Sequence, residues 1–145
     1  MAMRLPEEQL TYVTIGCLRR VCGEFGPGLL ESGYTAAVVY ACRQAGLSVE
    51  REVVVPLYFD GAAVAHYRMD IVIDRRLLVE LKACRVLRPD HIKQVMHYLR
   101  LTDLELALLF NFGEKPELKR FTLRNCIKRR PQTQVFSGDA TAQHE

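Results

Sequence analysis

The chain contains no tryptophan, and aromatic residues make up only 8% of its 145 residues. No apolar run approaches the ~20 residues that a helix needs to cross a bilayer. The N-terminal segment MAMRLPEEQLTYV also lacks the apolar stretch of a secretory signal. We therefore expect no membrane partner and a cytoplasmic location.

The cysteines are few, odd in number and scattered, and no CxxC pair occurs. This pattern argues against a disulfide framework and against a structural zinc site. We therefore expect free thiols in a reducing compartment. The five positions are Cys17, Cys22, Cys42, Cys84 and Cys126.

The composition is that of one soluble domain, with 49% apolar and 26% charged residues and a net charge of +3. The sequence contains no internal repeat. We predict that the domain spans residues 6–125. The final segment, residues 131–145, has little apolar surface to bury and is predicted to be a flexible C-terminal tail.

Apolar residues recur at helical spacing over residues 6–22 and 29–45, and a Gly/Pro-rich break separates these two segments. A third helix is expected to begin at Pro89, a residue suited to the first helical turn. Segments rich in β-branched, aromatic or apolar residues predict strands at 49–59, 66–73, 77–83, 104–110 and 118–123. This order predicts an α/β fold with a mixed central sheet flanked by helices.

Charged residues interrupt the third predicted strand, which is otherwise apolar. Glu80 and Lys82 are two residues apart and share one face of that strand. A hairpin that is symmetric about Arg75 places Asp70 opposite Glu80, with Cβ atoms about 5 Å apart. Two such carboxylates repel unless a proton or a cation lies between them, and oxygen ligands suit Mg²⁺ or Mn²⁺. The spacing alone leaves a structural carboxylate–lysine ion pair as the alternative.

Two helices add polar residues that face the predicted core. Glu31 lies one turn before Tyr34, so it is a candidate third carboxylate, and its alternative role is a first-turn acid favoured by the helix dipole. Gln94 and Tyr98 are four residues apart and share a helix face. Their alternative role is to flank the apolar stripe of the third helix.

A block near the C-terminus carries six cations and no acidic residue. Such a block can neutralise phosphate groups, so we predict nucleic-acid binding there, and the alternative is a solvated terminus. Its cations are Lys119, Arg120, Arg124, Lys128, Arg129 and Arg130.

In this order the motifs resemble those of the bacterial GxxExxY protein family, which is placed in the PD-(D/E)XK nuclease superfamily. The resemblance covers about Leu10 to Leu123 and departs from the family at Cys22, where relatives often have histidine. The matching segments are FGP and GLLESGY (residues 25–34), YRMD (67–70), VELKA (79–83), HIKQ (91–94) with Tyr98-Leu99, and LLFNFG (108–113).

The resemblance implies a RecB-like active site and the PD-(D/E)XK, or restriction-endonuclease-like, fold. In that arrangement Asp70 and Glu80 bind Mg²⁺ or Mn²⁺ with the backbone carbonyl of Leu81, and Glu31 completes the ligand shell directly or through water. The four-cysteine iron–sulfur cluster of some RecB-like exonucleases is not expected.

The remaining site residues act on water and phosphate in the implied arrangement. Lys82 orients or helps to deprotonate the attacking water. Gln94, with Tyr98 behind it, holds the active-site strand and the scissile phosphate in register. This chemistry suits phosphodiester hydrolysis, which needs a positioned water and cationic stabilisation of the transition state.

The resemblance therefore implies a metal-dependent nuclease that acts on DNA in preference to RNA. One alternative is a non-catalytic nucleic-acid-binding or regulatory module that retains the fold. Another is a small Holliday-junction-resolvase-like dimer, since cutting paired strands requires a two-fold assembly. Whether the chain forms a homodimer is left open by the sequence.

Overall fold

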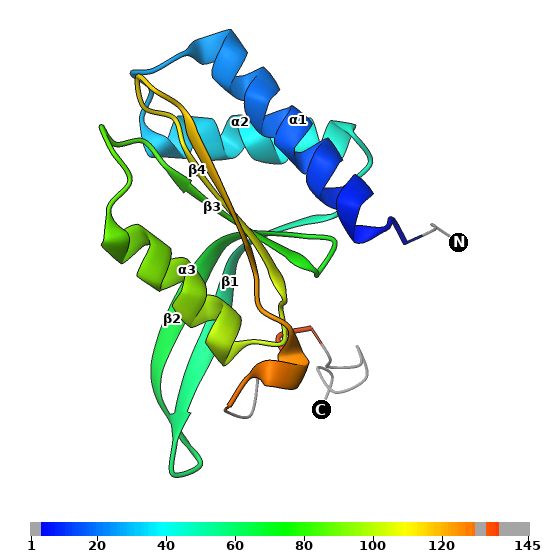
Figure 1. The fold of residues 1–145 in the computed structure, drawn as a ribbon, viewed down its shortest axis with the longest axis vertical. Coiled ribbons are helices and arrows are strands. Elements are labelled where there is room, and N and C mark those ends of the chain that lie inside the picture. The colour runs from blue at the N-terminus through cyan, green and yellow to red at the C-terminus, as the bar shows by residue number, and fades with distance from the viewer. Residues whose placement is uncertain (1–3, 130–132, 137–145) are drawn as a thin grey trace.

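The computed structural model describes residues 4–129 and 133–136 of the chain. Its elements follow the predicted order of two helices, three strands, a helix and two strands (Figure 1). The helices are α1 (Glu7–Phe25), α2 (Glu31–Gln44) and α3 (Pro89–Leu101), and a 3-10 turn, η1, covers Asn125–Ile127. The strands are β1 (Val49–Phe59), β2 (Ala62–Ile73), β3 (Leu77–Lys82), β4 (Leu106–Asn111) and β5 (Glu117–Thr122).

The strands form one mixed sheet in the order β1-β2-β3-β4-β5. Strands β3 and β4 are parallel and are joined through α3, whereas the other neighbouring strands are antiparallel. Helices α1 and α2 share a core cluster with one face of the sheet, and α3 shares a second cluster with the other face. The predicted mixed sheet flanked by helices is therefore confirmed.

Both central strands are buried on their two faces, as their apolar sequences predict. All six residues of β4 are buried, and in β3 only Lys82 is half-exposed. Leu77, Val79 and Leu81 join the cluster of α1 and α2, and Leu78 joins the α3 cluster. Because side chains alternate along a strand, Glu80 points to the α3 side together with Leu78.

The turn between β2 and β3 has the predicted position and register. Asp74 and Arg75 have φ values of 50° and 56°, and the Arg76 N–H donates to the Ile73 carbonyl at 3.0 Å. Ile73 then pairs with Leu77. Positive φ at both central residues is what a type I′ hairpin turn requires.

The second strand begins at Ala62, so the prediction of a start at residue 66 was wrong. Asp60 and Gly61, with φ values of 51° and 77°, join β1 directly to β2 as a two-residue hairpin turn. The alanines that follow have low strand propensity, and this composition concealed the first part of β2.

Part of the predicted flexible tail packs on the fold. The Thr133 N–H donates to the Leu101 carbonyl at 2.7 Å, and the Asp103 N–H donates to the Thr133 carbonyl at 3.1 Å. Val135 and Phe136 pack against the α3-side cluster. This short segment is therefore attached to the domain, whereas residues 131, 132 and 137–145 lie outside the described residues.

Candidate active site

Asp70 and Glu80 lie side by side on adjacent strands. The β2–β3 pairing runs from Ile73–Leu77 to Ile71–Val79, and the next position brings Asp70 to Glu80. The Asp70 N–H donates a hydrogen bond of 3.1 Å to Glu80 Oε1. The two carboxylates predicted to face each other are therefore neighbours in the structure.

The backbone is irregular beside Asp70. The β1–β2 pairing skips from Arg51–Ile71 to Val53–Met69, so Glu52 lies across from Asp70, and Glu52 has a φ of 50°. Where the β1–β2 pairing is interrupted, the Asp70 N–H donates its hydrogen bond to the Glu80 carboxylate. Residues held in such rarely populated conformations cluster at functional sites.

Glu80 is almost completely buried, with 1% of its surface exposed. Burial, first of all, raises the pKa of Glu80 from its ordinary value of 4.5 to about 9, and a hydrogen bond with the Asp70 side chain and the Asp70 charge add to this effect. The hydrogen bond from the Asp70 N–H, and then the charge of Lys82, oppose the shift. The raised pKa favours the protonated form of Glu80 at neutral pH, in which its hydroxyl can donate to the Asp70 carboxylate. A bound cation could relieve the repulsion between the two ionised carboxylates in the same way as this proton.

Helix α3 supplies Gln94 and Tyr98 to the same region. The Tyr98 hydroxyl donates to the Arg68 carbonyl at 2.8 Å, which attaches α3 to β2 two residues before Asp70. Burial and then the nearby Glu80 and Asp70 charges raise the pKa of Tyr98, while a hydrogen bond with the Gln94 side chain lowers it. The predicted pair on α3 is thus bonded together and lies within the electrostatic field of the two carboxylates.

Lys82 ends β3 on the face that carries Glu80. Its side chain is half-buried, and its charge acts on Glu80. The Leu81 side chain between them is fully buried on the opposite face, in the cluster of α1 and α2. The strand therefore presents one acid and one base to the α3 side.

The end of β4 fixes the loop that follows Lys82. Asn111 is fully buried, its Oδ1 accepts from the Cys84 N–H at 3.0 Å, and its Nδ2 donates to the Cys84 carbonyl at 2.9 Å. A Cβ atom on Gly113 would lie 2.5 Å from the Cys84 carbonyl oxygen. The Phe112 N–H donates to the Lys82 carbonyl at 2.8 Å. The sequence analysis gave Asn111 no role. A polar residue at the end of an otherwise apolar strand could have indicated that its side chain bonds to a neighbouring loop.

Tyr34 connects the GxxExxY segment to the end of β4. Its ring stacks on Phe112 with centroids 4.2 Å apart and an interplanar angle of 6°. Its hydroxyl donates to the Gly26 carbonyl and accepts from the Leu29 N–H. The tyrosine therefore attaches the loop before α2 to the strand that holds the Lys82 loop.

Glu31 is the first residue of α2 and is exposed. Within residues 4–129 and 133–136, no three histidine, cysteine or acidic side chains are gathered closely enough to hold a metal ion. The structure therefore brings Asp70 and Glu80 together but does not add Glu31 to them.

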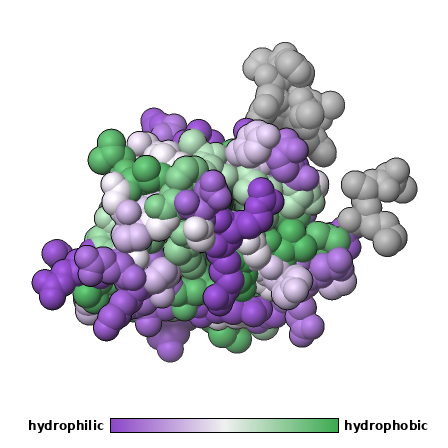
Figure 2. Space-filling model, turned by 90° about the horizontal axis from the view of Figure 1, so that it is seen from above, coloured by the Kyte–Doolittle hydropathy of each residue, from purple (hydrophilic) through white to green (hydrophobic). Residues whose placement is uncertain are grey.

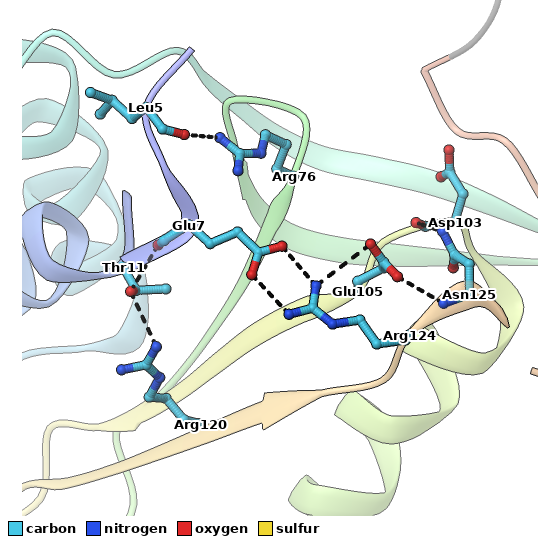
Figure 3. Close-up of polar contacts among 9 residues, drawn as sticks. All are labelled: Leu5, Glu7, Thr11, Arg76, Asp103, Glu105, Arg120, Arg124 and Asn125. Carbon is cyan, nitrogen blue, oxygen red and sulfur yellow. Dashed lines mark hydrogen bonds and ion pairs between the residues drawn. The ribbon is translucent and has the colours of Figure 1, made fainter. Parts of the chain in front are cut away.

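Three cations of the predicted nucleic-acid-binding block have intramolecular partners, and Figure 3 shows two of them, Arg120 and Arg124. Arg124 contacts both oxygens of Glu7, at 2.7 and 2.9 Å, and lies 3.7 Å from Glu105. Arg120 donates to Thr11 Oγ1 at 3.3 Å. Lys128 Nζ donates to two backbone carbonyls, at 2.8 and 2.7 Å. These contacts give the three side chains structural roles.

Two further members of the block are exposed. Lys119 is exposed on β5, which is separated from β3 by β4, and Arg129 is exposed after η1. Arg130 lies outside the described residues. Our sequence analysis overlooked exposed cations nearer the site, namely Arg85 in the loop after Lys82 and Lys93 beside Gln94. Their signal was their position directly after the Glu-x-Lys motif and on the third helix.

A sequence profile of the PD-(D/E)XK nuclease superfamily matches residues 8–121. The chain belongs to the PD-(D/E)XK nuclease superfamily. Its five-stranded mixed sheet with three helices has the restriction-endonuclease-like fold of that superfamily. Comparisons with curated proteins and with solved structures gave no significant match.

The donor atoms at the site of this PD-(D/E)XK protein fit a hard divalent cation. Asp70 and Glu80 offer side-chain oxygens, the ligand atoms that such cations prefer. A cation bound beside the pair would favour the ionised form of Glu80, whose pKa burial raises. Among the described residues, no helix is long and apolar enough to span a membrane.

Proposed function

We propose that this protein is a Mg²⁺- or Mn²⁺-dependent nuclease that hydrolyses phosphodiester bonds in DNA. The observation that supports the proposal most directly is the buried Glu80, which meets Asp70 on the adjacent strand of a PD-(D/E)XK sheet. A purely structural role would be fulfilled at lower cost by an apolar residue, because burial of an ionisable group is unfavourable.

Asp70, Glu80 and the Leu81 carbonyl would hold the metal ion, as in a RecB-like arrangement. When bound, Mg²⁺ supplies positive charge to the phosphate and lowers the pKa of a water molecule. The resemblance gives Glu31 a part through a bound water, because the structure does not bring its side chain to Asp70 and Glu80. The likeness to the GxxExxY family supports this assignment.

The Lys82 ammonium would face the attacking water and the phosphate from the end of β3. It would orient the water and offset the negative charge that develops on the phosphate oxygens. Gln94 would donate to a phosphate oxygen, and Tyr98 would hold both Gln94 and β2 in place. The bonds from Tyr98 to the Arg68 carbonyl and to Gln94 support these roles.

The DNA would lie across the α3 side of the sheet, where the charge of Lys82 acts on Glu80. Arg85 and Lys93 would contact the backbone beside the scissile phosphate, since phosphate contacts position a duplex or strand without reading its sequence. Lys119 and Arg129 would extend this surface. Arg120, Arg124 and Lys128 would contribute less to DNA binding, because their side chains are hydrogen-bonded within the protein.

The test is to incubate the purified protein with plasmid, linear and branched DNA and with RNA, with and without Mn²⁺. We expect Mn²⁺-dependent cleavage of DNA by the parent and none by Glu80→Gln. The matched control is Glu24→Gln, which changes an exposed glutamate on α1 and should cleave normally. Binding of DNA without cleavage of any substrate would instead assign the chain to non-catalytic binding modules.

A further inference from the structure

The hairpin of β1 and β2 continues beyond the rest of the sheet. We call residues 54–68 the β1–β2 arm. Its pairing runs from Val54–Arg68 to Phe59–Ala62, whereas β3 pairs with β2 only from Ile71 onward. Figure 1 shows the tip of this arm extending past the ends of the other strands. The arm is therefore a two-stranded ribbon without a third strand beside it.

One face of the arm lies toward α3 and the other is uncovered. The Tyr67 ring lies 5.5 Å from His97 and 6.5 Å from Tyr98, so Tyr67 faces α3. Strand residues alternate, and cross-strand partners share a face, so Arg68 and its partner Val54 point to the opposite side. Among the described residues, the core cluster of α1 and α2 includes no residue of the arm.

The arm exposes large apolar side chains in a short stretch. The exposed fractions are 44% for Val54, 58% for Tyr58, 68% for Phe59 and 58% for Val64. At the other end of the molecule, where α1 and α2 lie, hydrophobic residues are interspersed with hydrophilic ones (Figure 2). Alternation along β1 puts Tyr58 on the same side as Val54, the uncovered face, and Phe59 on the other side. Exposed apolar side chains gathered on one element mark an interaction surface, and Val54 and Tyr58 provide them on the uncovered face.

The charge of the arm favours a protein partner over a nucleic acid. No lysine or arginine occurs between Glu52 and Arg68, and Asp60 is the one acidic residue in that interval. A ribbon that enters a groove of DNA needs cations to neutralise phosphates, and this one has no lysine or arginine before Arg68 at its base. Pro56 removes a backbone N–H from the edge strand, so extension of the sheet by another strand is disfavoured. The remaining way for the arm to bind a protein is through the side chains of its uncovered face.

The tip of the arm carries an acidic residue and its base carries an exposed arginine. Asp60 lies in the turn at the tip. Arg68 lies at the base, where its side chain is 69% exposed and stands 3.9 Å from Glu52, beyond hydrogen-bond distance, so its guanidinium is accessible to a second acid. When two such arms pack in opposite directions, each tip lies against the other base. We propose that two copies of the chain associate through the uncovered faces of their arms, antiparallel about a two-fold axis, with Asp60 of each copy beside Arg68 of the other. Isologous contact of this kind closes at a dimer.

The test is sedimentation velocity of the full chain, without metal or DNA, over a roughly hundredfold range of concentration. We expect the parent to pass from monomer to dimer, with a dissociation constant of about micromolar order because the arm is a small interface. Tyr58→Lys should weaken association at least about tenfold, since it places a charge in the apolar contact. The control Tyr12→Lys changes a tyrosine on α1 that is more exposed than Tyr58, at 78%, and should leave association unchanged.

A charge exchange tests the antiparallel arrangement. Asp60→Arg and Arg68→Asp should each weaken the dimer, and the double variant should restore it, because the exchanged charges attract again. Melting curves identify any variant that fails to fold, and Val54→Lys then serves as the second probe of the same face.

A parent that stays monomeric throughout overturns the proposal, as does equal weakening by Tyr12→Lys. If the double variant weakens the dimer by the sum of the two single effects, the antiparallel geometry is wrong. A monomeric parent whose DNA binding is lost in Tyr58→Lys would show that the arm contacts nucleic acid instead. Since cleavage is not measured, failure of the proposed nuclease activity leaves these outcomes unaffected.

Discussion

Replacing Glu80 with glutamine should stabilise the metal-free protein at alkaline pH. The folded protein holds the pKa of Glu80 at about 9, whereas its ordinary value is 4.5. Between these two pH values the unfolded chain releases the proton and the folded chain retains it, so the stability of the parent falls as pH rises. The loss approaches about 1.4 kcal/mol per pH unit and amounts to about 3 kcal/mol at pH 7, as an upper limit.

The glutamine side chain cannot ionise, and its amide can still donate to Asp70 as the protonated acid does. We therefore expect the free energy of unfolding of Glu80→Gln, relative to the parent, to rise steadily between about pH 5 and pH 8. Urea unfolding at several pH values in the presence of a chelator measures this difference. Glu24→Gln, on an exposed part of α1, should show no such trend.

The same proton competes with the metal ion. Binding of Mn²⁺ displaces it, so below about pH 9 the apparent affinity for Mn²⁺ should rise about tenfold per pH unit. Calorimetry at two pH values in buffers of different ionisation enthalpy should detect the release of one proton. If the Glu80→Gln difference is independent of pH and no proton is released, then Glu80 is ionised in the metal-free fold and our reasoning about the site is wrong.

Four further substitutions, and Arg124→Ala as a control, separate the other roles. Lys82→Ala should retain the Mn²⁺-induced rise in melting temperature but slow plasmid nicking, because water and phosphate lose their cation. Gln94→Ala should likewise spare metal affinity and slow cleavage, and a large loss of Mn²⁺ binding would contradict its placement. Asn111→Ala should lower the free energy of unfolding by about 1–3 kcal/mol in urea melts, because the buried peptide groups of the next loop lose their partners. Lys93→Ala should weaken DNA binding at all sequences and flatten the log–log salt slope by roughly 0.9 in anisotropy titrations, whereas Arg124→Ala should leave that slope unchanged.

Sequence periodicity predicted the central part of the site because short-range rules govern it. A tight turn at Asp74–Arg75 fixes the hairpin register, and the two-residue strand period then carries Asp70 to Glu80. The apolar runs of β3 and β4 likewise identified buried strands. These features depend on neighbours in the chain, which a sequence displays directly.

Other features depend on contacts that no local pattern encodes. Glu7 and Arg124 are 117 residues apart, so the sequence of the cationic block could not predict their ion pair. The stack of Tyr34 on Phe112 joins α2 to β4 in the same way. The positive φ of Glu52 was also unpredictable, since glutamate has no preference for that conformation and the surrounding fold imposes it.

The sheet order has a consequence for biosynthesis. Because β1 to β5 lie side by side in the order of translation, each strand that leaves the ribosome meets a neighbour that is already made. The β2–β3 hairpin, with Asp70 and Glu80, therefore emerges before β4, whose Leu109 pairs with Glu80. The cover that buries Glu80, and so raises its pKa, includes α3 and β4, which are made after it. Completion of the fold therefore shifts Glu80 toward its protonated form.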